Sequence, residues 1–138
     1  MAILDDHGSL PVGLVERMCA VGGSAGIEPF DIIFNRIDEN GGSVVLLPDE
    51  GGASLANLRK QLVSGMRKSG IRHRKDYSYS PHMTVAYRNG SSSTQPIDPV
   101  GWTVDELVLI DSHVGRGHHE VLGRWKLRAR AEPQYQLL

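Results

Sequence analysis

A candidate β-hairpin over residues 29–48 constrains the fold most strongly. In the stretch PFDIIFNRID, Phe30, Ile32 and Phe34 recur at every second position, which is the side-chain period of a strand. The residues ENGG at 39–42 are typical of a tight turn, and SVVLLP at 43–48 reads as the returning strand. Strands joined by so short a turn pair antiparallel, so the pattern favours an antiparallel sheet over a doubly wound parallel one.

The rest of the chain adds two helices and further strands around this hairpin. Helical spacing predicts a first helix after Pro11 that ends at Gly22–Gly23. A second helix carries an apolar stripe and ends at Gly70, the stripe being Leu55, Leu58, Leu62 and Met66. Strands are expected at 1–4 (the tail of a strand), 82–87, 102–112 and 120–130, and the Pro- and Gly-rich segment 89–101 is expected to be a mobile loop. The fold class is therefore α+β, with the elements in the order β-α-β-β-α-β-β-β. We expect a single domain over 1–138. Its two halves share the order strand, helix, hairpin strands, which suggests a structural duplication.

Composition limits the cellular compartment and the kinds of partner that we expect for this chain. The formal net charge of −1 gives no strong overall attraction to nucleic acid or to an anionic membrane, although a local basic patch remains compatible with an RNA substrate. The single cysteine, Cys19, excludes an internal disulfide and fits a reducing cytoplasm. No apolar run approaches the ~18 residues of a membrane span, so no membrane partner is expected.

The motif Pro81-His82-Met83-Thr84 carries the clearest chemical signal. Side chains at i and i+2 of a strand point to the same face, so the His82 ring and the Thr84 hydroxyl would project side by side, about 7 Å apart at the backbone. An imidazole moves protons near neutral pH, and a hydroxyl donates hydrogen bonds. The pair therefore suits a phosphate ester, with Thr84 holding a non-bridging oxygen and His82 acting as an acid or base at a bridging one. A structural or merely exposed histidine is the alternative explanation of this motif.

The surrounding sequence resembles the 2H phosphoesterase superfamily, in its bacterial 2′-5′ RNA ligase-like branch. The stretch YSPHMTVAYR resembles the second His-x-Thr motif of that family. The stretches WTVDELVLIDS and HEVLGRWKL follow it in family order, with the matching residues Leu107, Val108, Leu109, Ser112, Gly115 and Trp125. The hairpin at 29–48 and the helix over 55–66 also fall in family order.

The resemblance implies a fold and an activity. It implies duplicated antiparallel sheets in two lobes, with helices packed outside and a pseudo-twofold cleft to which each lobe contributes one His-x-Thr strand. One histidine would act as base and the other as acid, with no metal or cofactor, on a 2′,3′-cyclic phosphate or a 2′-5′ phosphodiester in RNA or a small nucleotide. His82 would be catalytic and Thr84 would bind the phosphate. The alternative is a non-catalytic RNA- or nucleotide-binding module with half of the two-histidine site.

The first motif is not evident in these residues. The only other formal match is His7-Gly8-Ser9-Leu10, but Asp, Gly and Pro surround it where a strand would need β-formers. The stretch MAILDDHGSLPVGLVE instead resembles the end of the first motif strand, a loop and a helix. We therefore expect the first histidine to lie upstream of Met1, with His7 and Ser9 as the alternative and a chain that never had one as a third possibility. A missing opening strand would expose a sheet edge, which predicts a homodimer through that edge.

Other polar groups give weaker signals. Arg116, in a turn flanked by glycines, is a candidate phosphate contact, and Tyr79, beside the basic run at 72–75, is a candidate RNA contact against the alternative of a solvated loop. The group Asp111, His113, His118, His119 and Glu120 has no recognised metal-ligand spacing, so we expect a polar turn there and no metal.

Overall fold

Two antiparallel sheets and two α-helices make up the computed structural model, which describes residues 3–5, 7–75, 79–113 and 115–128. The elements in chain order are α1 (Leu14–Ser24), β1 (Phe30–Glu39), β2 (Val44–Pro48), the short 3₁₀ helix η1 (Asp49–Gly52), α2 (Ala53–Lys68), β3 (Met83–Ala86), β4 (Ser93–Val104), β5 (Glu106–His113) and β6 (His118–Lys126). The first sheet has the strand order β3-β2-β1-β4, and the second pairs β5 with β6. Every pair of neighbouring strands runs antiparallel, which confirms the expected α+β class.

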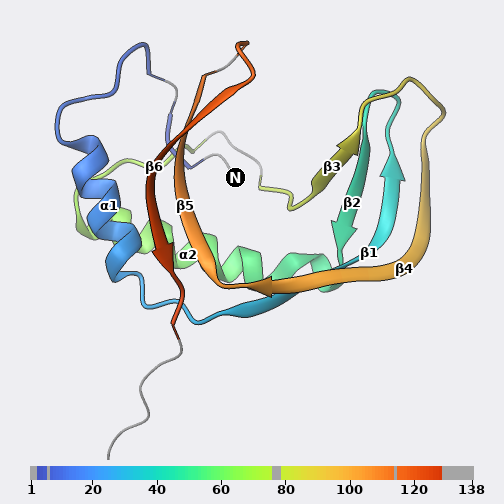
Figure 1. The fold of residues 1–138 in the computed structure, drawn as a ribbon, viewed down its shortest axis with the longest axis horizontal. Helices are drawn as coiled ribbons and strands as arrows, with labels where there is room; N and C mark the ends of the chain where they lie inside the picture. The colour runs from blue at the N-terminus through green and yellow to red at the C-terminus, as the bar shows by residue number, and fades with distance from the viewer. Residues whose placement is uncertain (1–2, 6, 76–78, 114, 129–138) are drawn as a thin grey trace, which may run out of the picture.

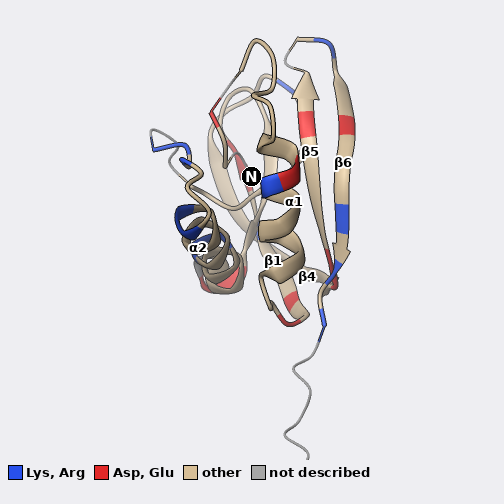
Figure 2. Ribbon diagram, turned by 90° about the vertical axis from the view of Figure 1, so that its left-hand side faces the viewer, with Lys and Arg blue, Asp and Glu red and all other residues tan. Residues whose placement is uncertain are grey.

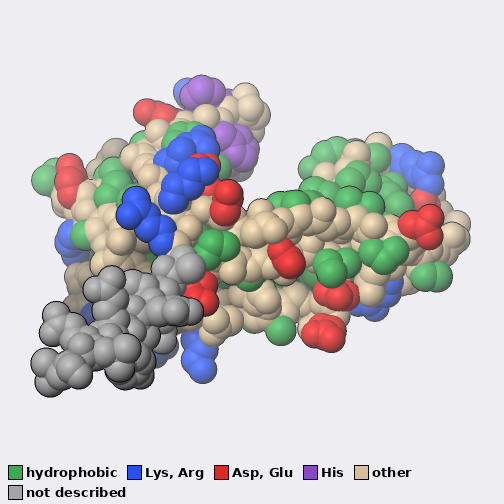
Figure 3. Space-filling view, turned by 60° about the horizontal axis from the view of Figure 1, so that its bottom comes forward, with side chains coloured by type: hydrophobic (Ala, Val, Ile, Leu, Met, Phe, Trp, Pro, Cys, Tyr) green, Lys and Arg blue, Asp and Glu red, His purple; other side chains and the backbone are tan. Residues whose placement is uncertain are grey.

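The molecule has two lobes that α2 connects. Figure 1 shows α1, β5 and β6 on one side, β1, β2 and β3 on the other, and α2 running between them. Figure 3 shows the same division as two masses with a narrower middle. Leu55 of α2 packs against buried residues of both lobes, so this helix joins the two hydrophobic clusters. Among the described residues, neither helix has the length and apolar character needed to cross a bilayer.

The hairpin of β1 and β2 forms as the sequence predicts. The side-chain oxygen of Asn40 accepts hydrogen bonds from the backbone N–H of Ser43 at 3.2 Å and from its hydroxyl at 3.1 Å. Gly41 adopts φ 87°, a left-handed conformation that glycine takes without steric cost. On β1, Ile32 and Phe34 are buried, in keeping with the expected period of two.

The second helix also follows its sequence pattern. Leu58, Leu62 and Met66 are buried on one face, and Met66 is fully enclosed. At its end the N–H of Ile71 bonds to the Met66 carbonyl at 2.8 Å and the N–H of Gly70 to the Arg67 carbonyl at 3.1 Å, with Gly70 at φ 70°. This is a Schellman motif, which ends the helix and directs the chain towards β3.

The expected loop at 89–101 is wrong, because most of it belongs to β4. This strand pairs along β1, with Glu39 opposite Ser93 and Phe30 opposite Val104. β4 lies at the edge of its sheet. Proline cannot donate a hydrogen bond to a neighbouring strand, and an edge strand has a neighbour on one side only, so Pro96 and Pro99 are tolerated there. Gly101 permits the close pairing, because an added methyl group there would lie 2.6 Å from the Ile32 carbonyl oxygen.

Three other strand predictions need correction. The strand expected over 102–112 is divided at Asp105, so that 102–104 complete β4 in one sheet and Glu106 begins β5 in the other. The N–H of Leu127 bonds to the Asp105 carbonyl at 2.7 Å at this crossing. In the expected strand at 1–4, residues 1 and 2 lie outside the described residues, while Ile3 and Leu4 form no strand and pack against the helical cluster. The last strand begins at His118 instead of at 120, and residues 129 and 130 lie outside the described part.

Candidate active site at the start of β3

Two anchored residues set the position of the His82 motif. Pro81 packs on η1, where Gly52 lies so close that an added methyl group would be 2.9 Å from the proline Cγ. Gly52 adopts φ 71°, which a residue with a side chain would take only under strain. Met83, two residues on, packs against the cluster of Ile32, Phe34 and Leu46. Pro81 and Met83 thus pack towards the protein interior. Because side chains alternate along an extended chain, His82 and Thr84 point away from the interior, and both are exposed.

The ring of His82 is oriented by a backbone hydrogen bond. Its Nδ1 atom lies 2.8 Å from the carbonyl oxygen of Ser80. A carbonyl oxygen only accepts, so Nδ1 must carry the proton in this contact. The neutral ring then presents a free lone pair at Nε2, and the protonated ring presents an N–H there. Nε2 of His82 is therefore placed to take up or release a proton at the surface.

Thr84 lies on an irregular part of the edge strand. It pairs opposite Val45, while Ala86 pairs opposite Val44, so Val85 is an extra residue that forms a β-bulge. Bulges turn side chains locally and are frequent beside functional sites. Arg88, after the strand, forms an ion pair with Glu39 of β1 and so ties the exit of β3 to the sheet.

The candidates for a first motif lie away from any strand. His7 and Ser9 are exposed in irregular chain before α1, so they do not share the strand face that a His-x-Ser pair needs. The described residues therefore contain one His-x-Thr pair at a strand, and the location of a second histidine stays a prediction.

The two weaker candidates have ordinary surroundings. Arg116 is exposed in the turn between β5 and β6, where its N–H bonds to the His113 carbonyl at 3.2 Å. Tyr79 is half-buried, and the guanidinium carbon of Arg59 on α2 lies 5.7 Å from its ring centroid. This cation–π contact holds Tyr79 against the helix. The roles of Arg116 and Tyr79 in binding phosphate or RNA stay predictions.

A separate cluster forms near the tip of the β5–β6 hairpin. Asp111, His113 and Glu120 each offer a donor atom, and these atoms lie within 4.8 Å of one another. The sequence places these residues near one turn, but their meeting depends on the cross-strand register that places Asp111 opposite Glu120. His118 and His119 face opposite sides as expected, since His118 pairs with His113 and His119 with Ser112.

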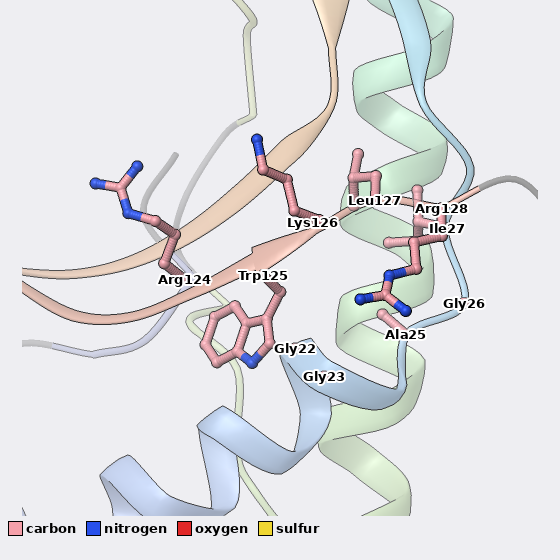
Figure 4. Close-up of a pocket in the computed structure, with 10 residues that line it drawn as sticks. All are labelled: Gly22, Gly23, Ala25, Gly26, Ile27, Arg124, Trp125, Lys126, Leu127 and Arg128. Atoms are coloured by element: carbon pink, nitrogen blue, oxygen red, sulfur yellow. The ribbon is translucent and has the colours of Figure 1, made fainter.

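A cavity of about 540 Å³ lies between the end of α1 and the end of β6 (Figure 4). The indole of Trp125 points towards Gly22 and Gly23, and an added methyl group at Gly22 would lie 2.8 Å from the ring. A methyl group at Gly123 of β6 would likewise lie 2.6 Å from the ring. Trp125 thus packs against glycines of both α1 and β6. Neither His82 nor Thr84 lines this cavity, so it is separate from the candidate active site.

Solved structures with the same fold are known. TT0787 of Thermus thermophilus superposes with a TM-score of 0.63 at 19% identity, covering 90% of this chain and 75% of that one. A crystal structure described as a phosphoesterase gives 0.64 at 21% identity, with 88% and 73% covered. E. coli LigT complexed with 3′-AMP gives 0.61 at 20% identity, with 86% and 71% covered. At these identities the likeness concerns the fold.

The family follows from the sequence match. No curated protein matches the chain. The model of the 2′-5′ RNA ligase superfamily does match, over residues 12–116, a range that includes His82 and Thr84. The match spans well over half of the chain and confirms the resemblance that the motif indicated. This protein therefore belongs to the 2′-5′ RNA ligase superfamily.

Proposed function

We propose that the protein is a metal-independent phosphoesterase that acts on 2′,3′-cyclic phosphates or 2′-5′ phosphodiesters in RNA or small nucleotides. Family membership supports the reaction class. The observation that carries the proposal is the contact of His82 Nδ1 with the Ser80 carbonyl, which leaves Nε2 available for proton transfer two residues before the exposed Thr84. The structure of LigT with 3′-AMP shows that one protein of this fold binds a nucleotide.

The chemistry assigns one role to each side chain. Nε2 of His82 either removes a proton from water or a ribose hydroxyl, or donates one to the leaving oxygen of the phosphate ester. The hydroxyl of Thr84 donates a hydrogen bond to a non-bridging oxygen and holds the phosphorus in line. Arg116 and Tyr79 are proposed as further contacts to phosphate and to RNA.

In-line displacement needs a second acid or base on the far side of the phosphorus. We propose that a histidine of a first His-x-Thr motif, encoded upstream of Met1, supplies this group. His7 with Ser9 is the alternative within the present residues. His7 would have to leave its irregular loop conformation to serve, which favours the upstream histidine.

A nucleotide- or RNA-binding module is the second candidate function. It is favoured by the single His-x-Thr pair at a strand among the described residues. Half of a two-histidine site would still hold a phosphate through Thr84 and His82, but it would lack the group that completes proton transfer.

We further propose a cytoplasmic protein that pairs with a second copy of itself. Cys19 is a free thiol, in keeping with a reducing compartment. The β5–β6 sheet has two strands, so each of them has an outer edge to which no other described strand is paired. Such edges expose backbone groups that accept a strand from another chain.

One comparison separates the two candidate functions. The 138-residue chain and a chain extended upstream along its genomic reading frame are incubated with 2′,3′-cyclic AMP, and hydrolysis and binding are both measured. We expect the extended chain to open the cyclic phosphate and the shorter chain to bind with little turnover. If both chains bind 2′,3′-cyclic AMP and neither hydrolyses it, the result would contradict the phosphoesterase proposal and support the binding module.

A further inference from the structure

The group of Asp111, His113 and Glu120 has the composition and geometry of a metal site. Nε2 of His113 lies 3.7 Å from an Asp111 carboxylate oxygen and 3.7 Å from a Glu120 carboxylate oxygen. All three donor atoms lie within 4.8 Å of one another. One imidazole and two carboxylates form a ligand set that suits Zn²⁺ and similar divalent ions.

The hairpin register builds this group on one face. Along β5, Leu107 and Leu109 pack against the helical cluster, and Asp111 and His113 continue the same alternation towards the tip. Glu120 lies directly opposite Asp111, and Figure 2 shows acidic positions side by side on the two strands. The three side chains are therefore held by paired backbone, and the exposed fraction is 28% for Asp111, 37% for His113 and 58% for Glu120.

Two carboxylates directly opposite each other on paired strands destabilise the hairpin unless a positive charge lies between them. A cation bound at this point would supply that charge. Donor atoms on a tetrahedral zinc ion with bonds of about 2.0–2.1 Å lie roughly 3.4 Å apart. The two separations of 3.7 Å are close to this value, so small rotations of the side chains would complete the arrangement.

We propose that Asp111, His113 and Glu120 bind a divalent transition-metal ion of the Zn²⁺ type, with water in the open fourth position. The ion links β5 to β6 and stabilises the hairpin tip that carries Arg116. His118 lines the site, with its ring centroid 5.3 Å from that of His113. The site serves the hairpin and takes no part in the phosphoester chemistry proposed for His82, and neither proposal depends on the other. A protonated His113 bridging the two carboxylates is the competing explanation of the same geometry.

The test titrates the full, tag-free chain with Co²⁺ and Zn²⁺ after removal of metals by chelation. We expect one equivalent of Co²⁺ to give a visible absorption spectrum without a thiolate charge-transfer band, which would separate this site from Cys19. Zn²⁺ should displace the cobalt and raise the unfolding temperature in a concentration-dependent way, because it binds the folded chain.

Matched variants assign the binding to these residues. His113→Ala and Asp111→Asn should each weaken Zn²⁺ binding at least about tenfold, since even outer-shell changes cost that much. The control is His119→Ala, which removes a neighbouring imidazole on the opposite face and should leave affinity unchanged. All variants are checked for a cooperative unfolding transition. No binding by the unmodified chain, or binding that His113→Ala leaves intact, would overturn the proposal and support the ion-paired alternative.

Discussion

Nδ1 of His82 lies 2.8 Å from the carbonyl oxygen of Ser80, a contact that fixes which ring nitrogen faces the solvent. The contact joins residues two positions apart, one on each side of Pro81. Pro81 is in turn held by its packing against η1 at Gly52. The proton-transfer atom of the proposed enzyme is thus oriented by local backbone and one packing contact.

The hydroxyl of Thr84 is predicted to contribute to activity and not to stability. Thr84→Val keeps the shape of the side chain but removes the donor to the phosphate. A hydrogen bond to a charged group contributes about 1.5–3 kcal/mol, so kcat/KM of the upstream-extended chain for 2′,3′-cyclic AMP should fall roughly 10- to 150-fold. Thr84→Ser, which keeps the hydroxyl, should stay within a few-fold of the original. Because Thr84 is exposed, both variants should unfold at the original temperature, and equal activity of Thr84→Val would remove its assigned role.

Gly52→Ala should lower both stability and activity. The left-handed backbone at φ 71° costs a residue with a side chain about 1–2 kcal/mol, and the new methyl group would also press on Pro81. Gly26→Ala is the matched control, since it has φ 61° but no atom within 4 Å of the added group. Unfolding midpoints and hydrolysis of 2′,3′-cyclic AMP are compared for both variants of the upstream-extended chain. If Pro81 positions His82, only Gly52→Ala lowers kcat, and equal loss in both variants would show that Pro81 does not position His82.

Gly123→Ala should destabilise the lobe of α1, β5 and β6. The added methyl group would lie 2.6 Å from the Trp125 ring and 3.2 Å from Cys19 Sγ, and overpacking of this kind typically costs about 1–3 kcal/mol. Gly42→Ala, with nothing within 4 Å, is the control and should change stability little. Denaturant unfolding measures both. A Gly123→Ala chain as stable as the control would mean that Trp125 repacks freely.

The proposed homodimer predicts a concentration-dependent mass. Light scattering coupled to gel filtration should show the dimer fraction rising with protein concentration. Val121→Lys places a charge on β6 at a side chain that is 50% exposed, and it should shift the equilibrium towards the monomer because charges discourage strand pairing. A single monomeric mass at every concentration would contradict pairing through an outer edge of the β5–β6 sheet.

Some elements could be predicted from the sequence because residues close to one another in the chain determine them. The β1–β2 hairpin follows from alternation and the Asn40 turn, and α2 follows from its leucine stripe and the Gly70 stop. The exposed pair His82 and Thr84 also follows from the period of a strand. In each case the residues that decide the outcome lie within a few positions of one another.

The features that were missed depend on distant parts of the chain. Pro96 and Pro99 indicate a loop until β4 is known to be an edge strand, which is a fact about the whole sheet. Likewise, Asp111 and Glu120 meet only because of the β5–β6 register. The orientation of the His82 ring depends on a rotamer that no spacing rule specifies.

The proposed phosphoesterase depends on acid–base chemistry by His82 at a phosphate ester. Its most direct test measures hydrolysis of 2′,3′-cyclic AMP by the upstream-extended chain and by its His82→Ala variant, with His119→Ala as the control for loss of an exposed imidazole. Acid–base residues typically contribute about 10²- to 10⁴-fold, so we expect His82→Ala to lose at least about 100-fold while unfolding at an unchanged temperature. Hydrolysis by His82→Ala at the rate of the control would contradict the assignment of His82 as a catalytic residue.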